Sequence, residues 1–128
     1  GVSSLAGIVT TSDGRSLSFA LMSEGTNPAD ARPGLDRIAA LLRDWPADRH
    51  LFFADELGGT PAAEAMRGAP GAAAILIGPE GGFDDDERAA IRALPQAIGI
   101  ALGPRILRAD TAAAAAIALW MASAGDWR

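Results

Sequence analysis

The stretch AAAILIGPEGGF (residues 72–83) joins an unbroken apolar run to a loop of glycine, proline and glutamate. A run with no polar position is typical of a parallel strand that is covered on both faces. Residues 97–107, AIGIALGPRIL, repeat the arrangement with a second apolar run that ends in glycine and proline. Because the carboxyl ends of parallel strands meet at one edge of a sheet, we expect the two loops to form a single site.

The segments around these two strands indicate a parallel sheet. HLFFA (50–54) predicts a short buried strand, and Thr60 and Pro61 then predict the N-cap and first position of a helix over 60–69. Each of the two apolar runs therefore has a helix and a strand before it in the chain, which is the order of parallel α/β folds.

The later segments continue this alternation. Asp84, with Glu87 three residues on, predicts a capping box at the start of a helix that Pro95 ends. An alanine-rich helix is expected to open at Asp110 or Thr111 and to run to about residue 124. Its apolar face, with Trp120, is expected to serve self-association. From residue 50 onward, the predicted order is β-α-β-α-β-α.

The first part of the chain has a different pattern. Residues 5–11 and 16–23 predict two antiparallel strands joined by the turn 12–15, and residues 33–45 carry apolar side chains at helical spacing. The sequence thus predicts one α/β domain, with an antiparallel hairpin and a helix ahead of a parallel sheet.

Composition excludes several kinds of chemistry. The 128 residues include no cysteine, and all 11 basic residues are arginine, so thiolate catalysis, Schiff bases and a phosphate-loop lysine are absent. The formal net charge of −5 argues against strong non-specific nucleic-acid binding. No apolar run approaches the ~20 residues that span a bilayer, and the lone His50 has no metal-ligand pattern around it.

The loop 78–82 alone leaves its ligand open. A glycine loop before a helix can cradle a phosphate, but Glu80 and the four acids at 84–87 disfavour an anion there. An uncharged or cationic ligand group fits better, and a tight structural turn is the remaining alternative.

Taken together, LIGPEGGF (76–83) and LGPRILRADTA (102–112) resemble the carboxyl-terminal motifs of the SPOUT-class 16S ribosomal RNA uridine-N3 methyltransferases, the RsmE family. The resemblance covers residues 48–128. It implies a fold with a deep trefoil knot, S-adenosylmethionine as cofactor, ribosomal RNA as substrate, a homodimer and a cytoplasmic protein without a metal. The cofactor-binding residues that it implies are Gly78, Pro79, Glu80, Gly81, Gly82, Leu102, Gly103, Ile106 and Leu107.

The same resemblance assigns the substrate side of the site. It implies Arg108 as the catalytic residue and Arg105, Arg108 and Thr111 as substrate contacts, with RADTA in place of the RTETA of many relatives. Glu80 supplies negative potential for the sulfonium. RNA binding is expected to be weak because the chain carries a net negative charge.

Residues 1–45 suggest a different origin. They resemble the C-terminal end of D-alanyl-D-alanine carboxypeptidases, which predicts a chimera of segments 1–47 and 48–128 joined near Trp45 and Pro46. Peptidase activity is excluded because its mechanism needs lysines that the chain lacks.

The family's RNA-binding barrel and the first strand, helix and second strand of its knotted domain are not found in the sequence, so no meaningful turnover is expected. Three functions stay open: an RNA methyltransferase, a cofactor-binding module without catalysis, and a chimeric or designed protein that only folds or associates.

Overall fold

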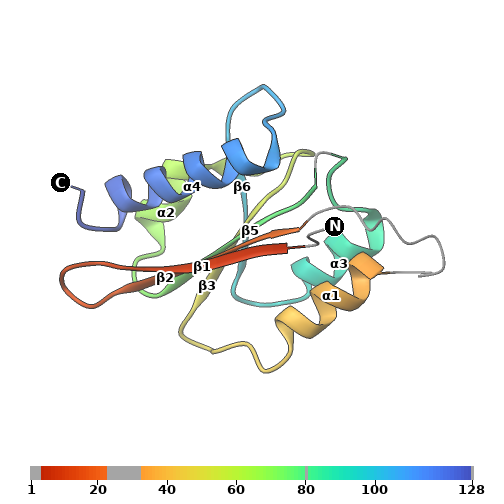
Figure 1. Ribbon diagram of the computed structural model, residues 1–128, viewed down its shortest axis with the longest axis horizontal. Helices are drawn as coiled ribbons and strands as arrows, with labels where there is room; N and C mark the ends of the chain where they lie inside the picture. Colours follow the sequence, from red (N-terminus) through yellow and green to blue (C-terminus); the bar gives the residue numbers. More distant parts are fainter. Residues whose placement is uncertain (1–3, 23–32, 80, 128) are drawn as a thin grey trace.

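The computed structural model describes residues 4–22, 33–79 and 81–127, which form one mixed sheet with helices on both faces (Figure 1). The sheet has six strands in the order β1-β2-β5-β3-β6-β4. The strands are β1 (Ser4–Thr10), β2 (Ser16–Met22), β3 (His50–Ala54), β4 (Thr60–Pro61), β5 (Ala73–Ile77) and β6 (Ala97–Ala101). The helices are α1 (Pro33–Leu42), α2 (Ala62–Gly68), α3 (Asp85–Arg92) and α4 (Ala109–Ser123).

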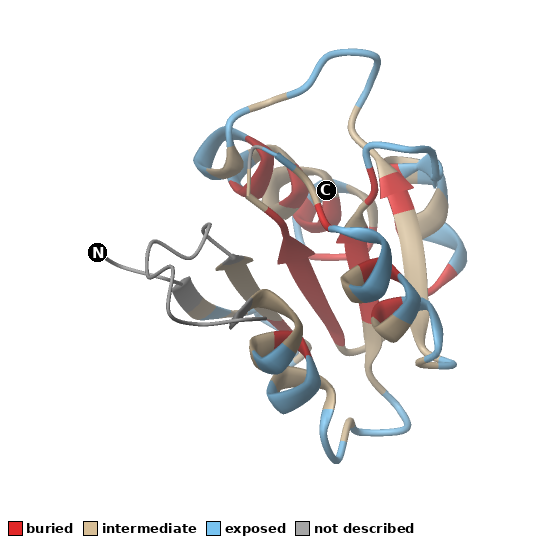
Figure 2. Ribbon diagram, turned by 90° about the vertical axis from the view of Figure 1, so that its right-hand side faces the viewer, coloured by how far each residue is buried: buried red, intermediate tan, exposed pale blue. Residues whose placement is uncertain are grey.

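The apolar run before Gly78 forms the central strand β5. All five of its residues are buried, and α1 and α3 lie on one side of the sheet while α2 and α4 lie on the other (Figures 1 and 2). Successive side chains of a strand point to opposite faces. Ile75 and Ile77 accordingly pack in the layer of α2 and α4, and Ala74 and Leu76 in the layer of α1 and α3.

The amino-terminal hairpin extends this sheet. β1 and β2 are antiparallel, with Gly7 opposite Phe19, and β2 then pairs in parallel with β5. The predicted hairpin is therefore confirmed. β2, β5, β3, β6 and β4 all run parallel to one another, as the sequence predicted for the strands from residue 50 onward.

The hairpin turn is fixed to the end of the chain. The Ser12 N–H donates to a carboxylate oxygen of Asp126 at 2.7 Å, and Arg15 donates to the carbonyl oxygens of Ala124 and Gly125. The Ser12 bond lowers the pKa of Asp126, and the Thr11 hydroxyl bond lowers the pKa of Asp13 in the same turn. The first and last segments of the described chain are thus joined by polar contacts.

Two helix boundaries differ from the predictions. Thr60 is not an N-cap, because it pairs with Ile100 in β4, and α2 begins after Pro61. Helix α1 ends at Leu42 rather than at residue 45, and Asp44 then takes a positive φ of 56°, which reverses the chain before Trp45. The indole N–H of Trp45 donates to the carbonyl oxygen of Arg49 at 2.8 Å.

The capping box of α3 is confirmed. The Glu87 N–H donates to Asp84 at 2.7 Å, and the Asp84 N–H donates to Glu87 at 2.8 Å. The box fixes the start of α3 directly after the loop 78–83.

Helix α4 begins at Ala109 with Arg108 as its N-cap residue, one residue before the predicted start. The alanine-rich face of α4 was expected to serve self-association, and that argument is wrong. Ala116 and Trp120 are completely buried, in the cluster that α4 forms with α2 and the sheet. Small alanines let the helix approach the sheet closely, so this face belongs to the core. Among the described residues, none of the helices is long and apolar enough to cross a membrane.

Candidate ligand pocket at the carboxyl edge of the sheet

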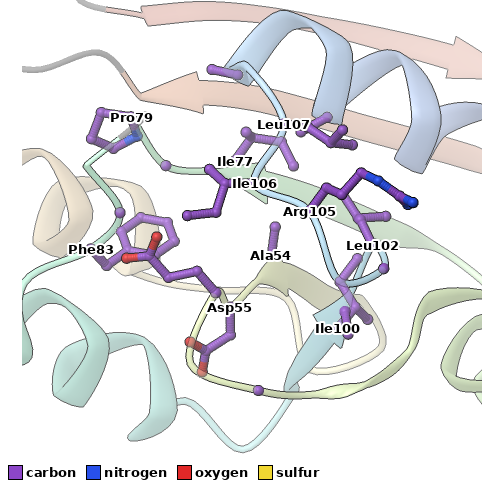
Figure 3. Close-up of a pocket in the computed structure, with 18 of the residues that line it drawn as sticks. Ala54, Asp55, Ile77, Pro79, Phe83, Ile100, Leu102, Arg105, Ile106 and Leu107 are labelled. Carbon is purple, nitrogen blue, oxygen red and sulfur yellow. The ribbon is translucent and has the colours of Figure 1, made fainter.

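The loops that follow β3, β5 and β6 surround a cavity of about 220 Å³ (Figure 3). Pro79 and Phe83 of the loop after β5 lie across this cavity from Leu102 and Leu107 of the loop after β6. The two loops that were expected to share a site therefore do so, because β3 alone separates β5 from β6 in the sheet. The space accommodates a small organic ligand rather than a macromolecule.

The loop after β5 approaches the cavity with its backbone. The Gly82 N–H donates to the carbonyl oxygen of Pro79 at 2.8 Å, and Gly82 has φ 78°, a conformation that glycine adopts without strain. A Cβ on Gly78 would come within 3.1 Å of the Phe83 ring. Gly78, Pro79 and Gly82 line the cavity, whereas the exposed Gly81 does not, and Glu80 lies outside the described residues.

The loop after β6 supplies most of the apolar wall. Leu102, Gly103, Arg105, Ile106 and Leu107 all line the cavity, and Gly103 has φ 99°. Ile106 is 75% exposed, so its side chain lies at the mouth of the cavity, where a ligand can cover it.

The predicted catalytic residue lies beside the cavity and does not line it. Arg108 is exposed at the amino end of α4. Thr111 is exposed on the first turn, and its N–H bonds to the Asp110 carboxylate at 2.8 Å. Of the predicted substrate residues, Arg105 alone lines the cavity, and Arg108 and Thr111 lie at the start of α4.

A buried carboxylate at the end of β3 was missed in the sequence analysis. Asp55 is 4% exposed; its Oδ1 accepts from Arg88 Nε at 3.2 Å and from the Leu57 N–H at 3.0 Å, and its Oδ2 accepts from Arg92. Arg88 also donates to the carbonyl oxygen of Phe83 at 3.1 Å. This ion-pair group connects the loop after β3, the loop after β5 and helix α3, so it fixes the lower wall of the cavity.

The acids after β3 had one signal in the sequence. ADE (54–56) directly follows an apolar strand, as the glycine loops do, and the carboxyl edge of that strand therefore faces the same site. Glu56 also lines the cavity, next to Asp55.

The lining limits the chemistry of the cavity. Within the described part of the chain, the lining residues carry no hydroxyl, thiol or imidazole side chain. The cavity therefore offers backbone groups, apolar walls and a few charges, which can bind and orient a ligand. Among the described residues there is no group of three side chains that could hold a metal ion.

Comparison with known proteins gives a consistent match. Residues 34–121 match the model of the RNA methyltransferase domain family. A segment of 44 residues, 34% of this chain, is 50% identical to the ribosomal RNA small subunit methyltransferase E of Rickettsia conorii.

A solved structure is similar over a larger part. The ribosomal RNA small subunit methyltransferase E of Neisseria gonorrhoeae, bound to S-adenosyl methionine, matches 71% of this chain with a TM-score of 0.61 and 28% identity. The match covers 38% of that chain, and the Rickettsia match covers 18% of its protein. The chain thus corresponds to much less than the whole of these relatives.

The matched span bears on the predicted joint. It begins at residue 34 and passes through Trp45 and Pro46, so the family match covers all of α1 but its first residue. The comparisons do not support a relation of residues 1–45 to carboxypeptidases, nor a chimera.

Proposed function

The chain belongs to the RNA methyltransferase domain family, and we propose that its pocket binds S-adenosylmethionine for methyl transfer to small-subunit ribosomal RNA. The observation that carries the proposal is the convergence of the two glycine loops on one cavity at the carboxyl edge of a parallel sheet. The Neisseria relative binds the same cofactor, and its fold matches most of this chain.

The cavity fits the parts of this cofactor. An adenine ring needs close backbone donors and acceptors, which glycines permit, together with apolar surfaces for its two faces. Gly78, Gly82 and Gly103 bring the backbone to the cavity, and Leu102 and Leu107 provide apolar wall. Gly81, Glu80 and Ile106 remain proposed contacts on the same two loops.

The proposed contacts to the RNA substrate are made mainly by arginines. S-adenosylmethionine supplies an electrophilic methyl group, and uridine N3 must lose its weakly acidic proton to accept it. A cation beside the base favours the deprotonated form. We assign this role to Arg108, exposed at the start of α4, with Arg105 and Thr111 as further RNA contacts.

The trefoil knot and the homodimer that the family resemblance implies stay predictions. Because the alanine face of α4 is buried within the chain, a dimer must use another surface. A mass measured by light scattering decides between monomer and dimer.

The test is a transfer assay with S-adenosylmethionine labelled in its methyl group and unmethylated small-subunit RNA. The proposed activity predicts label at uridine N3, in contrast to the absence of meaningful turnover expected from the sequence. It also predicts a loss of about a hundredfold in Arg108→Ala, as when one charge-stabilising group is removed from other enzymes. Arg67→Ala changes an exposed arginine on α2 and serves as the matched control. Equal transfer by wild type and Arg108→Ala contradicts the assignment, and cofactor binding without any transfer supports the non-catalytic module instead.

A further inference from the structure

Two acids follow β3 at the cavity, and their surroundings differ. The side chain of Asp55 is completely shielded from solvent, and both of its carboxylate oxygens accept bonds from arginines of α3. Its charge is therefore compensated by Arg88 and Arg92 and is not available to a ligand.

Glu56 has no such partner. It is exposed and lines the cavity, and within the described part of the chain its carboxylate makes no hydrogen bond or ion pair. A Cβ added to Gly82 would overlap the Glu56 carboxylate, so this carboxylate lies directly against the backbone of the first glycine loop. Among the described residues that line the cavity, Glu56 thus carries the one carboxylate that is free to attract a cation.

Glu56 follows β3, and its carboxylate lies on the side of the first glycine loop. β3 lies between β5 and β6, and the glycine loops that follow those two strands form the two sides of the cavity. Arg105 is the only cation among the described lining residues, and Figure 3 shows it beside Leu102, across the cavity from Phe83. The negative and positive charges of the cavity are therefore on different sides.

The proposed ligand has a matching charge distribution. In S-adenosylmethionine the positive sulfonium joins the adenosyl part to the amino-acid part, so the charge lies in the interior of the molecule. We propose that Glu56 recognises this sulfonium charge and makes the cavity prefer the charged cofactor to the neutral thioether left after methyl transfer. This inference rests on the proposed function, because it takes S-adenosylmethionine as the ligand.

The preference has a consequence for turnover. When the methyl group leaves, the C–S bonding electrons stay on sulfur and the sulfonium becomes a neutral thioether. The attraction to Glu56 then disappears, while the contacts of adenine and the amino-acid part persist. Glu56 therefore favours exchange of the spent cofactor for a fresh one, and its removal should increase inhibition by the product.

The experiment compares two ligands on the wild type, one variant and one control variant. S-adenosylmethionine and S-adenosylhomocysteine are titrated into the wild type and Glu56→Gln by calorimetry, with Glu64→Gln, an exposed acid on α2, as matched control. For an exposed charge pair we expect Glu56→Gln to weaken S-adenosylmethionine about three- to tenfold and to leave S-adenosylhomocysteine unchanged. The effect of Glu56→Gln on the affinity for S-adenosylmethionine should become smaller as the salt concentration is raised. An unchanged thermal melting curve shows that the variant is folded.

The outcomes separate the two proposals. Equal weakening of both ligands, or no weakening of either, overturns the role of Glu56 while leaving the pocket assignment intact. If the wild type binds neither ligand, the proposed function itself is wrong and the role of Glu56 is wrong with it.

Discussion

Removing the Asp55 carboxylate should strongly destabilise the protein. The side chain of Asp55 is fully buried and that of Arg88 is 11% exposed, whereas that of Arg92 is 53% exposed. In Asp55→Ala, Arg92 can turn to solvent, but Arg88 keeps a buried charge whose remaining acceptors are the Phe83 carbonyl oxygen and the fully exposed Asp85. The loss in the free energy of unfolding is therefore dominated by the unpaired charge of Arg88.

The expected size follows from this geometry. Breaking a buried ion pair from one side costs about 3–5 kcal/mol, a large part of the roughly 5–15 kcal/mol that stabilises a typical domain. At roughly 4 °C per kcal/mol for a chain of this size, the melting temperature should fall by about 10–20 °C.

The assay is urea unfolding followed by circular dichroism, with Asp48→Ala, which removes an exposed acid, as control. The double variant Asp55→Ala/Arg88→Met should be less destabilised than the sum of its single changes by at least about 1 kcal/mol, because it leaves no unpaired buried arginine. A loss below about 1 kcal/mol in Asp55→Ala, the range of exposed pairs, would refute the reasoning.

Three further changes test other parts of the fold. The buried indole N–H of Trp120 has no hydrogen-bond partner in the described structure, so Trp120→Phe should cost under about 2 kcal/mol and Trp120→Ala about 3–5 kcal/mol in chemical denaturation. A Cβ on Gly59 would lie 2.8 Å from the backbone of β6, whereas one on Gly68 meets nothing within 4 Å, so melting curves should show a loss in Gly59→Ala alone, of about 1–3 kcal/mol. The folded-state pKa values of Asp13 and Asp126 are lowered from 3.8, so their contribution is complete above about pH 4 and is lost as the pH falls through the lowered values. An acid titration of Asp126→Asn should therefore be flatter than that of the wild type.

Much of the fold was predictable because it depends on local patterns. The apolar run before Gly78 gave a buried parallel strand, and Asp84 with Glu87 gave a helix start, since each pattern is complete within a few residues. The convergence of the two glycine loops followed from the rule that parallel strands end at one edge.

The incorrect or missing predictions concern positions whose structure depends on residues that are distant in the sequence. Thr60 has the sequence of an N-cap but pairs with β6, about 40 residues away, and this pairing could not be predicted from its neighbours. Apolar residues, most of them alanine, occupy all sides of α4, so periodicity gave no direction for the Trp120 side chain. Asp55 and Arg88 are 33 residues apart, and only the folded sheet brings them together beneath the cavity.

The central claim is that the two glycine loops form a binding site for S-adenosylmethionine. A calorimetric titration of the wild type beside Gly82→Val tests it most directly, because Gly82 lines the cavity at φ 78° and a side chain there would displace the Glu56 carboxylate. We expect saturable binding of one cofactor per chain to the wild type, and its loss in Gly82→Val at an unchanged far-UV spectrum. No binding heat from the wild type at millimolar cofactor, or equal binding by both proteins, would show that the two loops do not form this site.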